Sequence, residues 1–205
     1  MWLFEQKGIY IHIPKTGGSS IRRALQRLPN TVDCGHFNLI QHEEKLLEGY
    51  SETDMKTSVG VFNDYTTFTI VRNPWDRMVS EWKWFTNTTY KKPRICVKAA
   101  FNGMGFEEFI DSFLYGGPCG DHRHRKPQAS FVHNRDNSTV QYIFRFENIN
   151  EEFVKICDLL KIPHMKLGHE LKTCREHYSI YYNTETKKQV EKVWGIDIDM
   201  FKYTF

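Results

Sequence analysis

A glycine-containing turn between an apolar strand and a helix constrains the fold of this chain more than any other feature. The segment 9–20 reads IYIHIPKTGGSS, in which three isoleucines alternate with other residues as they do in a strand. Pro14 is expected to end the strand, and Gly17 and Gly18 permit a tight turn that brings the backbone close to a ligand. Backbone N–H groups at the start of the following helix attract phosphate and sulfate, so the segment predicts an anion site.

The residues beside the glycines distinguish this loop from the phosphate loop of an ATPase or kinase. Ser19 or Ser20 is expected to cap an amphipathic helix over 19–28, and Lys15 and Thr16 precede the glycines. The NTP-binding pattern G-x-x-x-x-G-K-[ST] has its lysine after the glycines and a further glycine upstream. Here the lysine lies at the mouth of the turn and the upstream glycine is missing, which disfavours an ordinary ATPase or kinase.

A second strand, turn and helix occupy the segment 68–82, which reads FTIVRNPWDRMVSEW. Its apolar, β-branched start predicts a strand, and Asn73 followed by proline is typical of a helix N-cap and first turn. Arg72 then lies at the strand end and Ser80 about two turns into the helix, a pair that suits a second phosphate. Arg77 either joins this pair or forms an ion pair on the surface. One helix face is expected to be buried, made of Trp75, Met78, Val79 and Trp82.

Together the two segments resemble the paired signature of sulfotransferases that use 3'-phosphoadenosine 5'-phosphosulfate (PAPS). PKTGGSS resembles their 5'-phosphosulfate loop, and VRNPWDRMVSEW resembles their 3'-phosphate site. Within that family the chain is most similar to the carbohydrate sulfotransferases of the Golgi, in particular to the heparan sulfate 2-O-sulfotransferase type. Less specific matches at 124–131, 144–149 and 178–205 extend the resemblance over nearly the whole chain.

The resemblance implies a function and a set of donor-binding residues. The sulfuryl group would move from PAPS to an acceptor hydroxyl by in-line displacement, leaving 3'-phosphoadenosine 5'-phosphate (PAP), and no metal is needed. A saccharide is the implied acceptor. Arg72 and Ser80 would hold the 3'-phosphate. The residues implied at the phosphosulfate are Lys15, which also stabilises the leaving phosphate, and Thr16, Gly17, Gly18, Ser19 and Ser20.

An attacking hydroxyl also needs a base, for which the sequence offers His36. The resembling subgroup carries a histidine base in a similar glycine, histidine, aromatic context after its first helix, and imidazole titrates near neutral pH. A hydrogen-bonded structural role is the alternative for this histidine, and Asp33 or Glu43 could replace it as the base. The match departs from the subgroup at Cys34, where a second histidine is often found.

The order of the expected elements predicts an α/β fold in a single domain over 1–205, with a mainly parallel central sheet flanked by helices. The expected strands cover 8–13, 31–34, 67–71 and 139–146. The expected helices cover 19–28, 41–49, 74–87, 106–114, 151–161 and 185–194. A P-loop-like phosphosulfate loop would follow the first strand, at the sheet edge where such folds bind ligands. A long polar loop up to Ser138 is expected to help shape the acceptor cleft.

Charge and composition limit the other functions that this chain could have. The 28 basic and 25 acidic residues give a net charge of +3, which does not support a general nucleic-acid or membrane-surface binder. The segment 121–126, DHRHRK, fits no standard zinc pattern with Cys119, so a solvated loop that meets an anionic or sugar acceptor is expected. The basic segment 166–175 either folds over the adenine or the acceptor, or is an ordinary charged loop.

The N-terminus and the cysteines bear on localisation. The first ten residues resemble neither a signal peptide nor a membrane anchor, and no membrane insertion is expected. Because the Golgi relatives carry an anchor and stem, the chain is either a trimmed catalytic piece or, as expected here, a small soluble or cytoplasmic enzyme. An odd count of five cysteines then suggests reduced thiols, although Cys96 and Cys119 could pair in an oxidising compartment.

Two other classes of function stay open alongside the sulfotransferase. A nucleotide kinase or NTPase with an atypical phosphate loop would bind ATP with magnesium. A non-catalytic module for sulfated glycans would bind polyanions with strong salt dependence, and its binding would survive the loss of Lys15.

Overall fold

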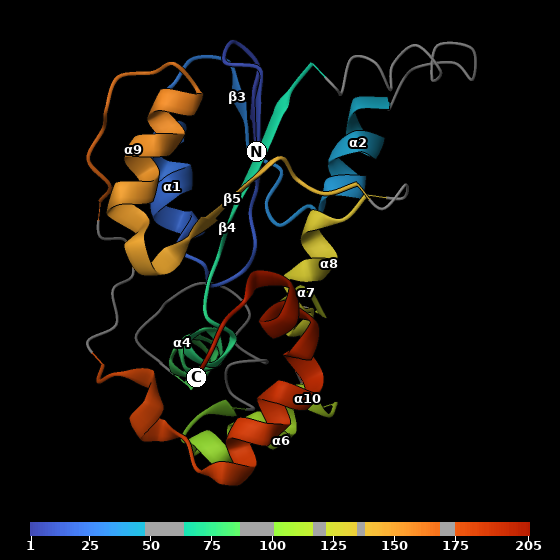
Figure 1. The fold of residues 1–205 in the computed structure, drawn as a ribbon, viewed down its shortest axis with the longest axis vertical. Coiled ribbons are helices and arrows are strands. Elements are labelled where there is room, and N and C mark those ends of the chain that lie inside the picture. The colour runs from blue at the N-terminus through green and yellow to red at the C-terminus, as the bar shows by residue number, and fades with distance from the viewer. Residues whose placement is uncertain (48–63, 87–100, 117–121, 135–137, 169–174) are drawn as a thin grey trace. The chain divides into compact units, whose positions relative to one another are not determined.

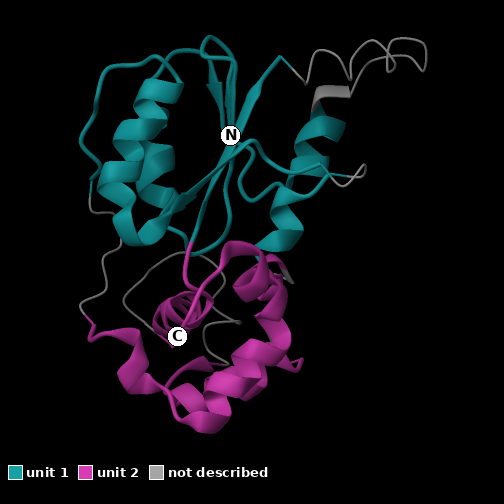
Figure 2. Ribbon diagram, in the orientation of Figure 1, with its two compact units in different colours: residues 1–71, 128–171 teal, residues 72–127, 172–205 magenta. Residues whose placement is uncertain are grey.

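The computed structural model describes residues 1–47, 64–86, 101–116, 122–134, 138–168 and 175–205 (Figure 1). The chain divides into two compact units (Figure 2). Unit 1 comprises Met1–Val71 and Gln128–Leu171, and unit 2 comprises Arg72–Pro127 and Lys172–Phe205. The assignment of 1–205 to one domain stays a prediction.

Unit 1 contains a five-stranded sheet of order β3-β1-β2-β4-β5. The strands are β1 (Trp2–Leu3), β2 (Gly8–Ile11), β3 (Thr31–Val32), β4 (Thr66–Val71) and β5 (Tyr142–Arg145). β4 pairs in parallel with β2 on one side and with β5 on the other, whereas β1 pairs antiparallel with both β2 and β3. The predicted α/β class with a parallel centre is confirmed. β1 was not predicted, because two residues are too few to show a strand period.

The helices of unit 1 cover both sides of this sheet. They are α1 (Gly18–Leu25), α2 (Leu39–Leu47), α8 (Ala129–Val132) and α9 (Ile149–Leu159), with a 3₁₀ turn η1 (Phe146–Asn148) before α9. Figure 1 shows α1 and α9 side by side on one side of the strands and α2 on the other. Ile21 and Leu25 of α1 meet Phe153 and Ile156 of α9 in a buried cluster that also holds Phe68 of β4. This packing fixes the start of α1 at the carboxyl end of β2.

Unit 2 is helical in its described residues. Its elements are α4 (Pro74–Thr86), α6 (Phe106–Leu114), α7 (His122–Arg125), η2 (Tyr178–Tyr181) and α10 (Thr184–Phe201). α4 contacts α6, η2 and α10. The predicted core face of α4 is confirmed, since Trp75, Met78 and Val79 are buried, although Trp82 is only half-buried.

Two differences from the sequence prediction have physical causes. The polar loop expected up to Ser138 contains the short helices α7 and α8, whose four residues each are too few to show a helical period. α10 continues seven residues past the predicted end at Trp194. That residue has non-helical backbone angles, φ −113° and ψ 24°, so the predicted end coincides with a kink inside the helix.

Arg77 is fully buried in unit 2, so its predicted ion pair on the surface is wrong. Its guanidinium donates to the backbone oxygens of Lys126 and His124, each at 3.0 Å. It also lies 4.4 Å from the centre of the Trp194 ring and 4.0 Å from a carboxylate oxygen of Asp197, which is itself fully buried. These contacts give Arg77 a structural role that joins α4, α7 and α10.

Candidate functional site

The first anion-binding segment forms a tight turn between β2 and α1. β2 ends at Ile11, two residues before the predicted end. Thr16 is fully buried, and its hydroxyl donates to the Ile13 backbone oxygen at 3.0 Å, which closes the turn on itself. Lys15 and Gly17 have left-handed backbone angles, with φ of 66° and 80°. A lysine seldom adopts such an angle. The structure of the turn therefore holds Lys15 in an unfavourable backbone conformation.

α1 begins at Gly18 with Gly17 as its N-cap, so the predicted capping role of Ser19 or Ser20 is wrong. Gly17 takes the cap position because it accepts a positive φ without a steric penalty, and it makes no side-chain cap bond. The two serines lie instead in the first turn of the helix, and both are half-buried. Their hydroxyls therefore stand beside the N-terminal amide groups that attract an anion.

Both glycines of the turn are required by close neighbours in unit 1. A Cβ atom on Gly17 would lie 2.5 Å from Ile149 Cδ1 and 2.9 Å from the Phe146 ring. A Cβ atom on Gly18 would lie 2.0 Å from Cδ2 and Nε2 of the His12 imidazole. The turn therefore packs tightly against His12, which directly follows β2, and against Phe146 and Ile149 at the start of α9.

Replacing Gly18 with alanine is expected to displace the His12 ring and to lower the free energy of unfolding by about 1–3 kcal/mol, as overpacking does elsewhere. Urea unfolding followed by circular dichroism measures this loss. Gly195→Ala is a control, because a Cβ there meets no heavy atom within 4 Å and alanine favours a helix. An unchanged urea midpoint for Gly18→Ala would show that His12 moves aside at no cost.

His36, the residue predicted as a base, lies beside this turn. Its Nδ1 is 2.9 Å from the backbone oxygen of His12, and the two imidazole centres are 4.2 Å apart. A carbonyl oxygen only accepts hydrogen bonds, so Nδ1 of His36 carries the hydrogen, and the lone pair of the neutral ring is on Nε2. The structure therefore brings His36 to the loop that carries Lys15 and gives it the tautomer of a base.

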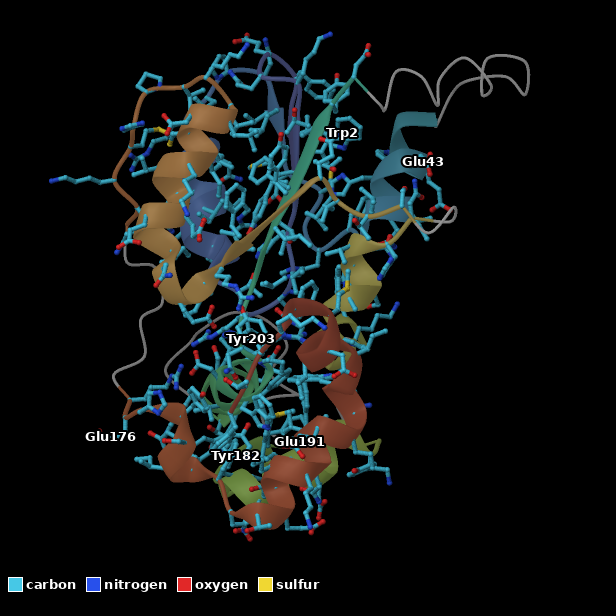
Figure 3. All side chains as sticks on the ribbon, in the orientation of Figure 1. Trp2, Glu43, Glu176, Tyr182, Glu191 and Tyr203 are labelled. Atoms are coloured by element: carbon cyan, nitrogen blue, oxygen red, sulfur yellow. The ribbon has the colours of Figure 1, made fainter. Side chains whose placement is uncertain are left out.

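The alternative bases have other surroundings. Asp33 is 2.8 Å from a guanidinium nitrogen of Arg22 on α1 and accepts the Gly35 amide at 3.0 Å, so both of its oxygens are engaged. Glu43 lies half-buried on α2 (Figure 3). Cys34, which stands where the subgroup often has histidine, is half-buried, and burial raises the pKa of its thiol.

The second predicted segment begins in β4 of unit 1 and continues into unit 2, whose first residue, Arg72, directly follows β4. Asn73 caps α4 as predicted, because its side-chain oxygen accepts the amides of Trp75 at 3.0 Å and Asp76 at 3.3 Å. Arg72 is buried, and its Nε donates to the Asp76 carboxylate at 2.7 Å. Ser80 lies half-buried in the second turn of α4.

Arg175 is another charged residue of this region, and the sequence did not predict its partner. Its guanidinium forms an ion pair with the other carboxylate oxygen of Asp76. Burial would raise the pKa of Asp76, but the charges of Arg72 and Arg175 outweigh it and hold that pKa below its usual value. Arg175 ends the basic segment expected to fold over the adenine or the acceptor. No spacing rule connects it with Asp76, which lies 99 positions earlier.

The histidine-rich segment before Pro127 is not simply a solvated loop. His124 is buried, with its Nδ1 2.8 Å from the fully buried Glu81 carboxylate and its ring stacked on Trp84. No group of three or more histidines, cysteines, aspartates or glutamates could hold a metal ion within the residues that the structure describes. The possible pair of Cys96 and Cys119 lies outside the described residues.

Among the helices formed by the described residues, none combines the length and the apolar character needed to cross a membrane.

Comparison with known proteins extends the likeness over the whole chain. The model of the sulfotransferase family matches residues 5–204. Human carbohydrate sulfotransferase 9 is 26% identical over 234 residues, which cover 98% of this chain and 52% of that protein. The chain therefore spans about half the length of this curated relative. No solved structure gives a significant match.

Proposed function

Because this chain belongs to the sulfotransferase family, we propose that it transfers the sulfuryl group of PAPS to a hydroxyl group of a carbohydrate. The observation that carries the proposal is the turn of unit 1. Lys15 precedes the N-terminus of α1 there, and His36 is bonded to the backbone oxygen of His12, which directly follows β2. The similarity to human carbohydrate sulfotransferase 9 supports the acceptor class. The heparan sulfate 2-O type stays a prediction.

The turn suits a phosphosulfate group for reasons of space and charge. The glycine positions have no room for a Cβ beside His12, Phe146 and Ile149, so only glycines fit where the turn enters α1. Thr16 contributes its backbone, because its buried hydroxyl donates to Ile13. The residues proposed to hold the phosphosulfate are Lys15, Thr16, Gly17, Gly18, Ser19 and Ser20. Arg72 and Ser80 of the second segment are proposed to hold the 3'-phosphate.

The side chains of unit 1 then have distinct chemical roles. When bound, the donor supplies the sulfuryl group and a phosphate whose bond to sulfur breaks as the acceptor oxygen attacks from the opposite side. Lys15 provides positive charge where the departing phosphate becomes more negative. Nε2 of His36 accepts the proton of the attacking hydroxyl, while Nδ1 stays bonded to the His12 carbonyl oxygen. Lys15 and the helix N-terminus supply the positive charge, so the proposal invokes no metal ion.

Replacing His36 with alanine is expected to lower the turnover number about 100-fold to 10,000-fold, the usual contribution of a general base. The affinity for PAP is expected to stay unchanged, because His36 is proposed to act on the acceptor. Turnover with a saccharide acceptor and calorimetric titration with PAP measure the two effects. His164→Ala is the matched control, since this exposed histidine pairs with Asp158 in the same unit. Normal turnover of the His36 variant would mean that another group is the base.

The donor itself is tested by calorimetric titration with PAP and, in a parallel cell, with ATP and magnesium. The proposal expects PAP to bind more tightly than ATP. A preference for ATP would favour the kinase or NTPase alternative. Binding of sulfated glycans without PAP affinity or turnover would favour the glycan-binding module.

A further inference from the structure

The imidazole of His12 contacts two parts of the proposed site in unit 1. Its ring centre is 4.2 Å from that of His36, with an angle of 50° between the two ring planes. It also meets the start of α1, because a Cβ atom on Gly18 would lie 2.0 Å from both Cδ2 and Nε2 of the His12 ring. One side chain therefore touches the proposed base and the first residue of the helix proposed to bind the donor.

The position of the His12 ring is set by the buried part of the sheet. His12 lies two residues after Tyr10 of β2, so the two side chains share one face, and their rings stack with centres 5.7 Å apart. Tyr10 pairs in register with Phe68 of the neighbouring β4, and these two rings stack at 5.4 Å. Tyr10 and Phe68 are fully buried, and His12 is 6% exposed. This aromatic series runs from the core to the site and ends against His36.

Other contacts hold the backbone around His36 and one atom of its ring. Asp33 pairs with Arg22 of α1 at 2.8 Å and accepts the Gly35 amide at 3.0 Å, which ties this loop to the helix. Nδ1 of His36 is bonded to the His12 backbone oxygen at 2.9 Å. A bond at Nδ1 does not by itself fix the tilt of the ring plane, on which the position of Nε2 depends. The neighbouring His12 ring limits this tilt.

The surroundings of His12 argue against a role as the base itself. Its Nδ1 is buried, and its Nε2 lies against Gly18 at the start of α1. A general base must come within about 2.6–3.2 Å of the oxygen whose proton it takes. With both nitrogens covered by the protein, the His12 ring is suited to support a neighbouring side chain.

We propose that His12 is a positioning residue, whose imidazole sets the orientation of His36 relative to the N-terminus of α1. This inference rests on the proposed function, because it assumes that His36 takes the proton of the acceptor hydroxyl. A displacement of about 1 Å at a reacting group can cost about 100-fold in rate, so a ring that limits the tilt of His36 affects turnover without contacting the substrate. Its contact with Gly18 relates this orientation to the helix proposed to bind the donor.

Replacing His12 with alanine is expected to lower the turnover number about 10-fold to 100-fold and to leave the affinity for PAP unchanged. The substitution removes the ring but keeps the backbone oxygen that accepts the Nδ1 bond of His36. Turnover with PAPS and a saccharide acceptor and calorimetric titration with PAP measure the two effects. His12→Gln has a side chain of similar length that takes up no proton near neutral pH, so it should restore most of the turnover. Turnover of His12→Gln as low as that of His12→Ala would overturn the positioning role.

A double variant separates positioning from a merely structural role. If His12 acts through His36, His12→Ala should cause no further loss of turnover in the His36→Ala protein. An equal loss in both backgrounds would contradict the inference. Ile156→Ala is the control for lost stability, because it truncates a fully buried side chain of α9. It should lower the urea midpoint and leave turnover unchanged. If His12→Ala does not fold, His12→Asn, which shortens the side chain less, takes its place in each comparison.

NMR of the ligand-free protein reports the orientation without any turnover. The Nδ1–H signal of the His36 ring, assigned by its loss in His36→Ala, is expected to be protected from exchange with water in the wild type. His12→Ala should lose this protection, and His12→Gln should keep it. Full protection in His12→Ala would show that the His36 ring is held without the His12 side chain, which would overturn the inference.

The outcomes separate this inference from the function on which it rests. If His36→Ala loses turnover while His12→Ala keeps it, the positioning role is wrong and the proposed base stands. If the wild-type protein neither binds PAP nor transfers the sulfuryl group, the proposed function and this inference are both overturned.

Discussion

Replacing Lys15 with alanine is expected to lower the rate of sulfuryl transfer about 100-fold to 1,000-fold, the loss typical of removing one group that stabilises developing charge. Lys15 stands at the mouth of the turn, half-buried, with a left-handed backbone of φ 66°. The substitution removes the cation nearest to the N-terminus of α1 in sequence while leaving its amide groups in place. Single-turnover kinetics with PAPS and a saccharide acceptor measure the chemical step directly.

The chain offers a close control for this experiment. Lys7 is also a lysine of unit 1 with a left-handed backbone, φ 46°, but it is exposed in the turn between β1 and β2. Lys7→Ala removes the same charge at the same kind of backbone conformation away from the proposed site, so its rate should match the wild type. Lys15→Ala with a normal rate would show that the turn does not serve the leaving group, whatever else it binds.

The local structure of both motifs could be predicted from the sequence because their signals are short in range. Asn73 was predicted as an N-cap and is one. The cap involves only neighbouring residues, because the asparagine side chain accepts amides two and three positions later. The cap of α1 was misplaced because either serine could have served. Gly17 takes the position with a positive φ, and Phe146 and Ile149 leave no room for a Cβ there.

Contacts between distant segments could not be predicted in this way. Periodicity indicates which face of a helix is apolar, but it does not say which charged residue is buried with that face. Arg77 was therefore expected near a phosphate or on the surface, although the structure buries it between α4, α7 and α10. The pairing of Arg175 with Asp76 was missed for the same reason, because the two residues are 99 positions apart. In both cases the tertiary packing determines which residue is the partner, and that partner cannot be identified from a single sequence.

Replacing Arg77 with alanine is expected to lower the free energy of unfolding by about 3–5 kcal/mol, because it removes a buried positive charge that acts on two buried carboxylates. Asp197 and Glu81 are both fully buried, and the charges of both act on Arg77. The backbone oxygens of Lys126 and His124 would also lose their donor. Urea unfolding followed by the fluorescence of Trp194, whose ring lies under the guanidinium, measures the loss.

A second substitution distinguishes the effect of the Arg77 charge on stability from the effect of its packing. Asp197→Asn in the Arg77→Ala background removes one of the carboxylates left behind, so the double variant should be more stable than Arg77→Ala alone. Lys188→Ala, at an exposed position of α10, is the control and should unfold like the wild type. If the double variant is no more stable than the single one, the loss comes from the cavity and the carbonyl groups. The charge of Arg77 would then count for less than its contacts with Trp194 and the backbone oxygens of α7 and Lys126.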